Sequence, residues 1–427
     1  MTFAERVFRL EGRERVPVVL AALFAFCTLF SYYLLRPVRD EISSADRGNL
    51  QLLWTAVFLV MLVAVPLYSA AVSRWSRAAF IPWANRCFAL NLLAFYAALV
   101  LLPETARPWI DRVFYVWSSV FALFIVTVFW GFIADLFRNE QGRRVFGLIA
   151  VGASLGGITG SAGTAFLAER VPVFALLLLA TLPLEAAARL AGVLHRHSGQ
   201  AGSALRVERE PRVGGTAWSG IVAVFRSAYL SRIALYFVLM TFCSTILYYE
   251  QAHLLGAALA NRAARTTYLA RIDLAVNGLT LLAQGVLTAQ LIRAIGLGVT
   301  LAVLPAVAAL GFLGLGASPA LAALAVVQVL YRSSQHGVSK PAREVLFTLL
   351  ARDERYKSKA FIDTAVYRGG DLVSAWAYAG LAAAGLSVAA IALVSAPVAA
   401  GWAVVALLLG RDESERRRTA GSNGDGD

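Results

Sequence analysis

Charge is scarce in this chain of 427 residues, of which only 15% are Asp, Glu, Lys or Arg and 59% are hydrophobic. Soluble proteins carry about 25% charged residues, and a soluble chain of this length needs them to cover its surface. The scarcity therefore excludes a water-soluble fold. Apolar runs of about 20 residues, enough to cross the hydrocarbon core of a bilayer, recur along the whole sequence. The chain is predicted to be an all-α protein embedded in the lipid bilayer.

Cysteine and histidine are rarer still. The three cysteines, Cys27, Cys87 and Cys243, lie within apolar runs and show no CxxC spacing, which predicts buried reduced thiols. Two of the four histidines, His195 and His197, have no carboxylate or cysteine nearby, so they do not form a zinc-site pattern. We expect no metal, no cofactor and no enzyme activity.

Hydropathy predicts twelve membrane spans. The first apolar run lacks a small-residue cleavage site and is followed by further spans, so we expect a retained helix and not a signal peptide. The predicted spans lie near residues 17–37, 50–72, 80–103, 110–134, 145–168, 171–194, 231–254, 266–292, 296–317, 319–340, 358–384 and 387–410.

Basic residues are unevenly distributed over the predicted loops. They gather before span one, after spans two and four, and in the connections 195–230 and 340–359, whereas the alternate loops carry few or none. The positive-inside rule then places both termini in the cytoplasm. The net charge of +13 is mostly this topology signal. Because the cations are spread over short loops, they argue against nucleic acid as a partner.

A polar stretch at 195–230 divides the chain. It separates a six-span half at 1–194 from a second at 231–410, and a tail at 411–427 is expected to be disordered. Six plus six spans, both termini inside and a long central connection resemble the layout of major facilitator transporters, whose halves are related by a pseudo-twofold axis. The predicted fold is therefore a twelve-helix, major-facilitator-type membrane fold.

Four segments carry a more specific resemblance. SYYLLRPVRDE at 31–41, FWGF at 129–132, KPARE at 340–344 and the charged segment 355–376 resemble the nucleotide exchange transporters. This family comprises the ATP/ADP translocases of plastids and intracellular bacteria and their shorter bacterial relatives. The resemblance implies alternating access, exchange of anionic nucleotides and, for a divergent short bacterial relative, the cytoplasmic (inner) membrane.

The resemblance also assigns residues. It places Arg39 where the family has a substrate-binding cation in span one, and Tyr115 where it has an acidic residue in span four. The acidic residue of span seven falls near Tyr248, with Glu250 two positions later. The lysine of span eleven falls close to Asp371. One of the four positions keeps its charge, so ATP/ADP exchange in particular does not follow.

Span eleven places Asp363, Arg368 and Asp371 inside a membrane helix, where such charges usually face a bundle interior or a water-filled path. Arg368 is about 15 Å from the start of its helix, and Asp371 follows at i+3, so the two can pair. One interpretation makes Arg368 a fork for phosphate or carboxylate, released from Asp371 when substrate binds. The alternative is a permanent internal ion pair.

Three other spans contain candidate substrate-binding residues, each of which also has a purely structural interpretation. In span ten, Arg332 binds a ligand or is satisfied by Asp363 or Asp371. In span eight, a polar stripe lines a cavity or forms interhelical hydrogen bonds, and its first aspartate can also pair with the neighbouring Arg271. In span seven, tyrosines face a cavity or belong to an aromatic interface belt. The stripe and the tyrosines comprise Asp273, Asn277, Thr280, Gln284, Tyr248 and Tyr249.

Glycines recur in span five at Gly152, Gly156, Gly160 and Gly163. Small residues every four positions favour close helix packing. A phosphate-binding loop is excluded because no Lys-Ser/Thr pair follows.

The sequence thus predicts a monomeric secondary transporter for a small organic anion, with a nucleotide or another phosphorylated metabolite as the first choice. Arg39, Arg332 and Arg368 would neutralise the anion, which favours exchange because empty carriers would bury unpaired cations. Candidate counter-ions or proton sites are Asp363, Asp371, Glu250 and Asp273, and Tyr248 and Asn277 complete the candidate substrate site. The alternatives are a proton-coupled facilitator or exporter, and a transporter-like sensor without flux.

Overall fold

The computed structural model describes residues 15–75, 77–137, 139–200, 222, 224–350 and 352–422. Most of the predicted connection at 195–230, and residues 423–427 of the predicted tail, lie outside these ranges. The described residues form two compact units. The first falls within Met1–Asp46, Leu52–Glu210 and Leu259–Asn277, and the second within Arg47–Gln51, Pro211–Ala258 and Gly278–Asp427.

Long helices build the first unit. Short 3₁₀ turns at Arg47–Asn49 (η1, of the second unit) and Glu104–Ala106 (η2) connect some of them. The helices are α2 (Arg15–Ala45), α3 (Leu50–Arg74), α4 (Arg77–Leu101), α5 (Arg107–Leu136), α6 (Asn139–Leu167), α7 (Ala175–Gln200) and the first part of α10 (Arg262–Ala317).

The second unit contains the remaining elements, two of which are π-helical. They are α9 (Ala228–Ala258), the rest of α10, α11 (Leu321–Ser334), η3 (Gln335–Ser339, π), α12 (Lys340–Thr348), α13 (Arg352–Phe361), η4 (Ile362–Val366, π), α14 (Tyr367–Ala383) and α15 (Val388–Ser422). Single π-helical turns within α-helices frequently mark functional positions, and the two here contain His336 and Asp363.

Among the described residues, helix is found in each of the twelve predicted spans. Gly296, with φ of 78°, breaks α10 into spans eight and nine, while α11–η3–α12 forms span ten and α13–η4–α14 forms span eleven. Among the described residues, nine helices are long and apolar enough to cross a membrane. Spans eight, ten and eleven are not in that set, and they are the spans that carry Asp273, Arg332 and Arg368.

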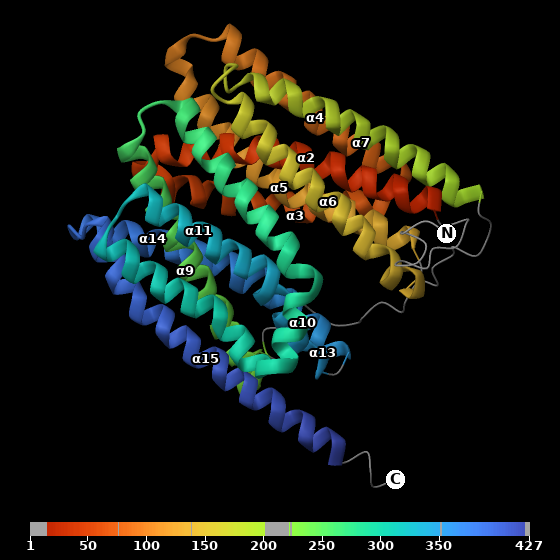
Figure 1. The fold of residues 1–427 in the computed structure, drawn as a ribbon. Coiled ribbons are helices and arrows are strands. Elements are labelled where there is room, and N and C mark those ends of the chain that lie inside the picture. The colour runs from red at the N-terminus through yellow and green to blue at the C-terminus, as the bar shows by residue number, and fades with distance from the viewer. Residues whose placement is uncertain are drawn as a thin grey trace. The chain divides into compact units, whose positions relative to one another are not determined.

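Helices α2 and α6 approach each other closely through glycine, as predicted. A Cβ at Gly152, Gly156 or Gly160 would collide with the backbone carbonyl oxygen of the facing α2 residue, which is Ala22, Phe26 or Phe30. Figure 1 shows α2 lying along α6 and α7. The charged end of α2 is therefore held by backbone-to-backbone packing.

In the second unit, α9 packs between α14 and α15. Gly370 of α14 lies against Thr241 of α9, and the rings of Tyr249 and Tyr378 are 4.7 Å apart on the same pair of helices. Of the two adjacent glycines of α14, Gly370 makes this close approach, whereas Gly369 has no atom near its Cβ position.

The last helix is longer than predicted. We expected a disordered tail from residue 411, but α15 continues to Ser422. Arg232 of α9 forms an ion pair of 2.5 Å with Asp412, and Glu413 pairs with Arg417 one turn along the helix. These contacts stabilise the end of α15. That segment is too polar for hydropathy to predict it as a helix.

Candidate functional site

Arg36 connects α2 with the first part of α10 inside the first unit. Its Nη1 donates a hydrogen bond to Oδ1 of Asp273 at 3.1 Å, and its Nε lies 3.7 Å from Asp40. Asp273 is buried, with a side chain 2% exposed. It therefore pairs with Arg36. The alternative partner, Arg271, is exposed and, at a spacing of two residues, does not share a helix face with Asp273.

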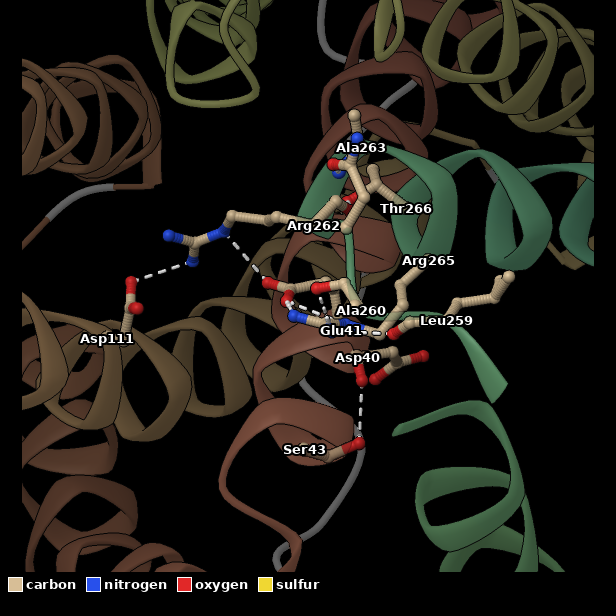
Figure 2. A network of polar contacts seen from close by, with 11 residues as sticks. Asp40, Glu41, Ser43, Asp111, Leu259, Ala260, Arg262, Ala263, Arg265 and Thr266 are labelled. Atoms are coloured by element: carbon tan, nitrogen blue, oxygen red, sulfur yellow. Dashed lines mark hydrogen bonds and ion pairs between the residues drawn. The ribbon is translucent and has the colours of Figure 1, made fainter. Parts of the chain in front are cut away.

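Glu41 is the centre of a second charged network (Figure 2). Arg265 donates to its Oε1 from Nη2 at 2.6 Å and from Nε at 3.1 Å. Arg262 lies 2.9 Å from its Oε2 and donates to Asp111 of α5 at 2.8 Å. Only 1% of the Glu41 side chain is exposed. One buried carboxylate thus holds two arginines of α10, and Asp111 extends the network to α5.

Sequence reasoning missed Arg262, Arg265 and Asp111. Hydropathy placed Glu41 near the outer end of span one, where a carboxylate needs no partner. The available signal was the density of arginine between 262 and 271 in a segment with almost no acidic residues of its own. Such cations require carboxylates from elsewhere in the chain when they are buried.

Arg39, the cation assigned by resemblance, lies over the ring of Tyr115 of α5. The guanidinium carbon is 4.7 Å from the ring centroid, and Nη1 is 3.4 Å from Asp40. Tyr115 is fully buried. Arg39 is therefore held both by cation–π attraction to Tyr115 and by an ion pair with Asp40.

Asn277 is half-buried on the polar stripe of α10. Its Nδ2 donates to Oγ of Ser161 on α6 at 3.3 Å, and Gly157 lies against both Asn277 and the ring of Tyr33. Of the two alternatives for this stripe, an interhelical hydrogen bond is present at Asn277. The side chain of Gln284 lies outside the described residues.

In the second unit, Arg368 and Asp371 form the predicted i,i+3 pair on α14, with 3.9 Å between Nη1 and Oδ2. Thr245 of α9 donates to Oδ1 of Asp371 at 3.5 Å. The Arg368 side chain is 40% exposed, against 14% for Asp371. Among the described residues, no group accepts a hydrogen bond from Arg368, and its guanidinium remains available.

The other predicted residues of this unit have diverse surroundings. Arg332 is nearly buried and Tyr248 is half-buried. Glu250 is 0% exposed, and neither of its carboxyl oxygens has a hydrogen-bond partner among the described residues. Asp363 is exposed, and the charges that act on it come from Lys359, Glu344, Arg343 and Lys340.

Within the described ranges, no group of three or more His, Cys, Asp or Glu side chains is arranged to hold a metal ion. The charged side chains described above neutralise one another inside the helix bundle, and Arg368 is suited to neutralise a further negative charge.

No protein-family model matches this sequence, and no curated protein matches it. Solved structures do match over nearly the whole chain. The POT family transporter PepTSo is 13% identical, covers 94% of this chain and 98% of its own, and has a TM-score of 0.64. A bacterial homologue of the human lysosomal transporter Spinster, inward-facing and unoccupied, is 13% identical over 96% and 98%, with a TM-score of 0.58.

The nucleoside transporter NupG, as a D323A mutant, is 10% identical over 94% of this chain and 99% of its own, with a TM-score of 0.57. At such low identity these likenesses establish the fold. The chain has the all-α, major-facilitator-type membrane fold that its sequence predicted.

Proposed function

We propose that this protein is a secondary transporter that moves an organic anion by alternating access and works as an exchanger. A nucleotide or another phosphorylated metabolite is the first choice of substrate. The observation that carries this proposal is Arg368, a guanidinium within a membrane span that has no hydrogen-bond acceptor among the described residues and a single ion pair of 3.9 Å.

A charge in this position is costly, by about 2.5–3.5 kcal/mol on insertion scales. Its retention needs a reason, and an anionic substrate provides one. A guanidinium offers five N–H donors in a planar fork that matches two oxygens of a phosphate or carboxylate. Asp371 would balance the charge of Arg368 between substrates, and Thr245 would hold the carboxylate while the arginine binds the anion.

Exchange follows from the same electrostatics. A carrier that closed without substrate would bury the Arg368 guanidinium with only its 3.9 Å ion pair to Asp371, and a bound anion removes that penalty. We propose Arg332 and Arg39 as further substrate-binding cations, and Tyr248 and Asn277 as further substrate-binding residues. Asp363, Glu250 and Asp273 would act as counter-ions.

The similar structures support transport without selecting a cargo, because they include a peptide transporter, a nucleoside transporter and a homologue of a lysosomal transporter. The class of substrate is therefore inferred from the charged residues of this chain. The distribution of basic loops supports an orientation with both termini in the cytoplasm. We propose that the carrier lies in a bacterial cytoplasmic membrane, as the resemblance implies, and acts as a monomer.

The test begins with a thermal-shift panel of nucleotides, sugar phosphates and dicarboxylates on the purified protein. The anion that stabilises it best is then loaded, radiolabelled, into proteoliposomes. Exchange predicts that the same unlabelled anion outside accelerates efflux. Arg368→Ala should abolish this acceleration. Arg411→Ala, which removes an exposed arginine of α15, is the matched control and should leave it intact.

If no anion stabilises the protein, or if Arg368→Ala exchanges as well as the wild type, the proposed function is wrong. Efflux that is unaffected by external substrate would also contradict exchange.

Proton coupling is the second candidate, and Glu250 is the observation that favours it. A carboxyl group that is 0% exposed and accepts no hydrogen bond from the described residues is suited to carry a proton. Under this alternative, an imposed pH gradient drives uptake without internal substrate, and Glu250→Gln abolishes that uptake. Under exchange, the wild type itself shows no uptake in this assay.

A further inference from the structure

Resting on the proposed function, we propose that Arg343 of α12 is a second anion-binding group. Together with Arg368, it forms a two-arginine site for a doubly charged phosphate monoester. The site lies along α9 in the second unit, and neither the sequence pattern of span ten nor the motif 340–344 assigned Arg343 such a role.

The partners of Arg343 are unusually weak for a guanidinium. Nη1 contacts Sδ of Met240 at 2.9 Å, and the guanidinium carbon is 4.8 Å from the ring centroid of Phe237. Its Nε is buried without a hydrogen-bond partner. Among the described residues, no carboxylate lies within ion-pair distance. The adjacent Glu344 pairs with Lys359 instead.

A thioether is a poor acceptor, so among the described residues Arg343 has one N–H···S contact, one aromatic face and no oxygen acceptor, and its Nε is left unsatisfied. A purely structural arginine at a membrane-helix end would extend its head group to water. This side chain instead lies on α9, in contact with Met240 and Phe237. That position suits a group whose oxygen acceptors come from a ligand.

Arg343 and Arg368 reach the same level of α9. Contacts between α9 and α14 occur in the same order along both helices, from Thr241 with Gly370 to Tyr249 with Tyr378. Arg368 precedes Gly370 by two residues, or about 3 Å of helix rise. The Cα of Arg368 is therefore level with Thr241 and its neighbour Met240, the residue that Arg343 contacts. The guanidinium of Arg368 reaches toward Asp371, which is bonded to Thr245 about one turn further along α9.

Tyr367 supports the placement of both arginines in this part of the unit. It lies at the start of α14 and within electrostatic range of both Arg343 and Arg368, as well as of Asp371 and Asp363. Asp371 balances one of the two positive charges. A dianion that displaced Asp371 from Arg368 would be balanced by the two arginines together.

This arrangement predicts the charge of the substrate. Two guanidinium groups can bind three oxygens of one phosphate with charge-assisted hydrogen bonds, whereas a monocarboxylate has only two oxygens and one charge. We therefore expect glucose 6-phosphate, used as the probe, to bind more tightly than gluconate, a monoanion of similar size, at equal ionic strength.

The experiment measures both dissociation constants by thermal shift for the wild type and for Arg343→Ala, Arg343→Lys, Arg368→Ala and the control Arg411→Ala. Arg343→Ala should weaken glucose 6-phosphate by about tenfold or more, the size expected for one lost charge-assisted contact, and should change gluconate binding much less. Arg343→Lys, which keeps the charge without the fork, should be intermediate. The Arg411→Ala control should bind like the wild type.

The outcomes separate this proposal from the proposed function. If Arg368→Ala loses binding and Arg343→Ala does not, Arg343 is no part of the site and anion transport stands. If Arg343→Ala weakens both probes equally, the two-arginine site is overturned in favour of general electrostatic attraction. If the wild type binds neither of the two probes nor any anion of the thermal-shift panel, both proposals fail. If Arg343→Ala does not fold, Arg343→Lys decides, since an unchanged preference for the phosphate would overturn the proposal.

Discussion

Arg36 and Asp273, 237 residues apart in the chain, form an ion pair in which Nη1 of the arginine donates to Oδ1 of the aspartate across 3.1 Å. The pair joins the end of α2 to the first part of α10, and the side chains are 18% and 2% exposed. Asp273 thus belongs to a polar contact that holds span eight against span one. Because both charges sit in low-dielectric surroundings, each depends on the other.

Removal of one charge of the Arg36–Asp273 pair should therefore lower the free energy of unfolding more than removal of both charges. We expect Asp273→Ala to destabilise the protein by about 3–5 kcal/mol, the usual effect of leaving one buried charge unpaired. Arg36 would retain the longer contact to Asp40 and its contact with the ring of Tyr33. Arg36→Leu combined with Asp273→Ala should lose less than Asp273→Ala alone, and therefore less than the sum of the two single variants. Thermal unfolding in detergent, arranged as a double-mutant cycle, measures this coupling, and additive losses would show that the two charges are independent.

Glu41 should be the most sensitive carboxylate of the first unit. Glu41→Gln removes the charge that both Arg262 and Arg265 contact, so we expect a loss of several kcal/mol. The matched control is Glu104→Gln. Glu104 is 85% exposed and lies 3.4 Å from Arg107, and exposed pairs contribute about 0–1 kcal/mol. Equal melting temperatures for the two variants would contradict the network as a stabilising element.

Gly370→Ala should disturb the α9–α14 contact beside the candidate anion site. Its new Cβ would collide with Oγ1 of Thr241, and such overpacking costs about 1–3 kcal/mol. The neighbouring Gly369→Ala is the control, because nothing lies near that Cβ position and alanine favours a helix by about 1 kcal/mol. Thermal melts should thus move in opposite directions.

Thr241→Ala offers a rescue. It removes Oγ1, the atom nearest the new Cβ, so Gly370→Ala should cost less in that background than in the wild type. If the cost is the same in both backgrounds, the collision with Thr241 is not its cause.

The twelve spans and the all-α fold could be predicted because each rests on local composition. Apolar length and the placement of basic loops are properties of short windows, and so is the glycine repeat that packs α6 on α2. The i,i+3 relation of Arg368 to Asp371 was predictable for the same reason, since helix geometry alone brings those two side chains together.

The partners of Asp273 and Glu41 could not be predicted from local spacing. Arg36 and Arg265 come from distant segments, and only the packing of α2 beside α10 brings them into contact. Arg343 was missed for another reason. Hydropathy ended span ten at residue 340, whereas the structure continues it through η3 and α12 to Thr348. The helix therefore carries this arginine toward α9, where sequence reasoning saw only a loop.

Gly156 tests whether close packing of α2 and α6 is needed for a stable carrier. Its Cβ position meets the backbone oxygen of Phe26, and a helix backbone cannot yield as a side chain can. We expect Gly156→Ala to lower the melting temperature by forcing α6 away from α2, despite the better helix propensity of alanine. Gly147→Ala on the same helix has nothing near its Cβ position and should preserve or raise the melting temperature. A Gly156→Ala protein as stable as Gly147→Ala would mean that α2 and α6 can separate without loss, and the glycine contact would then not position the charged end of α2.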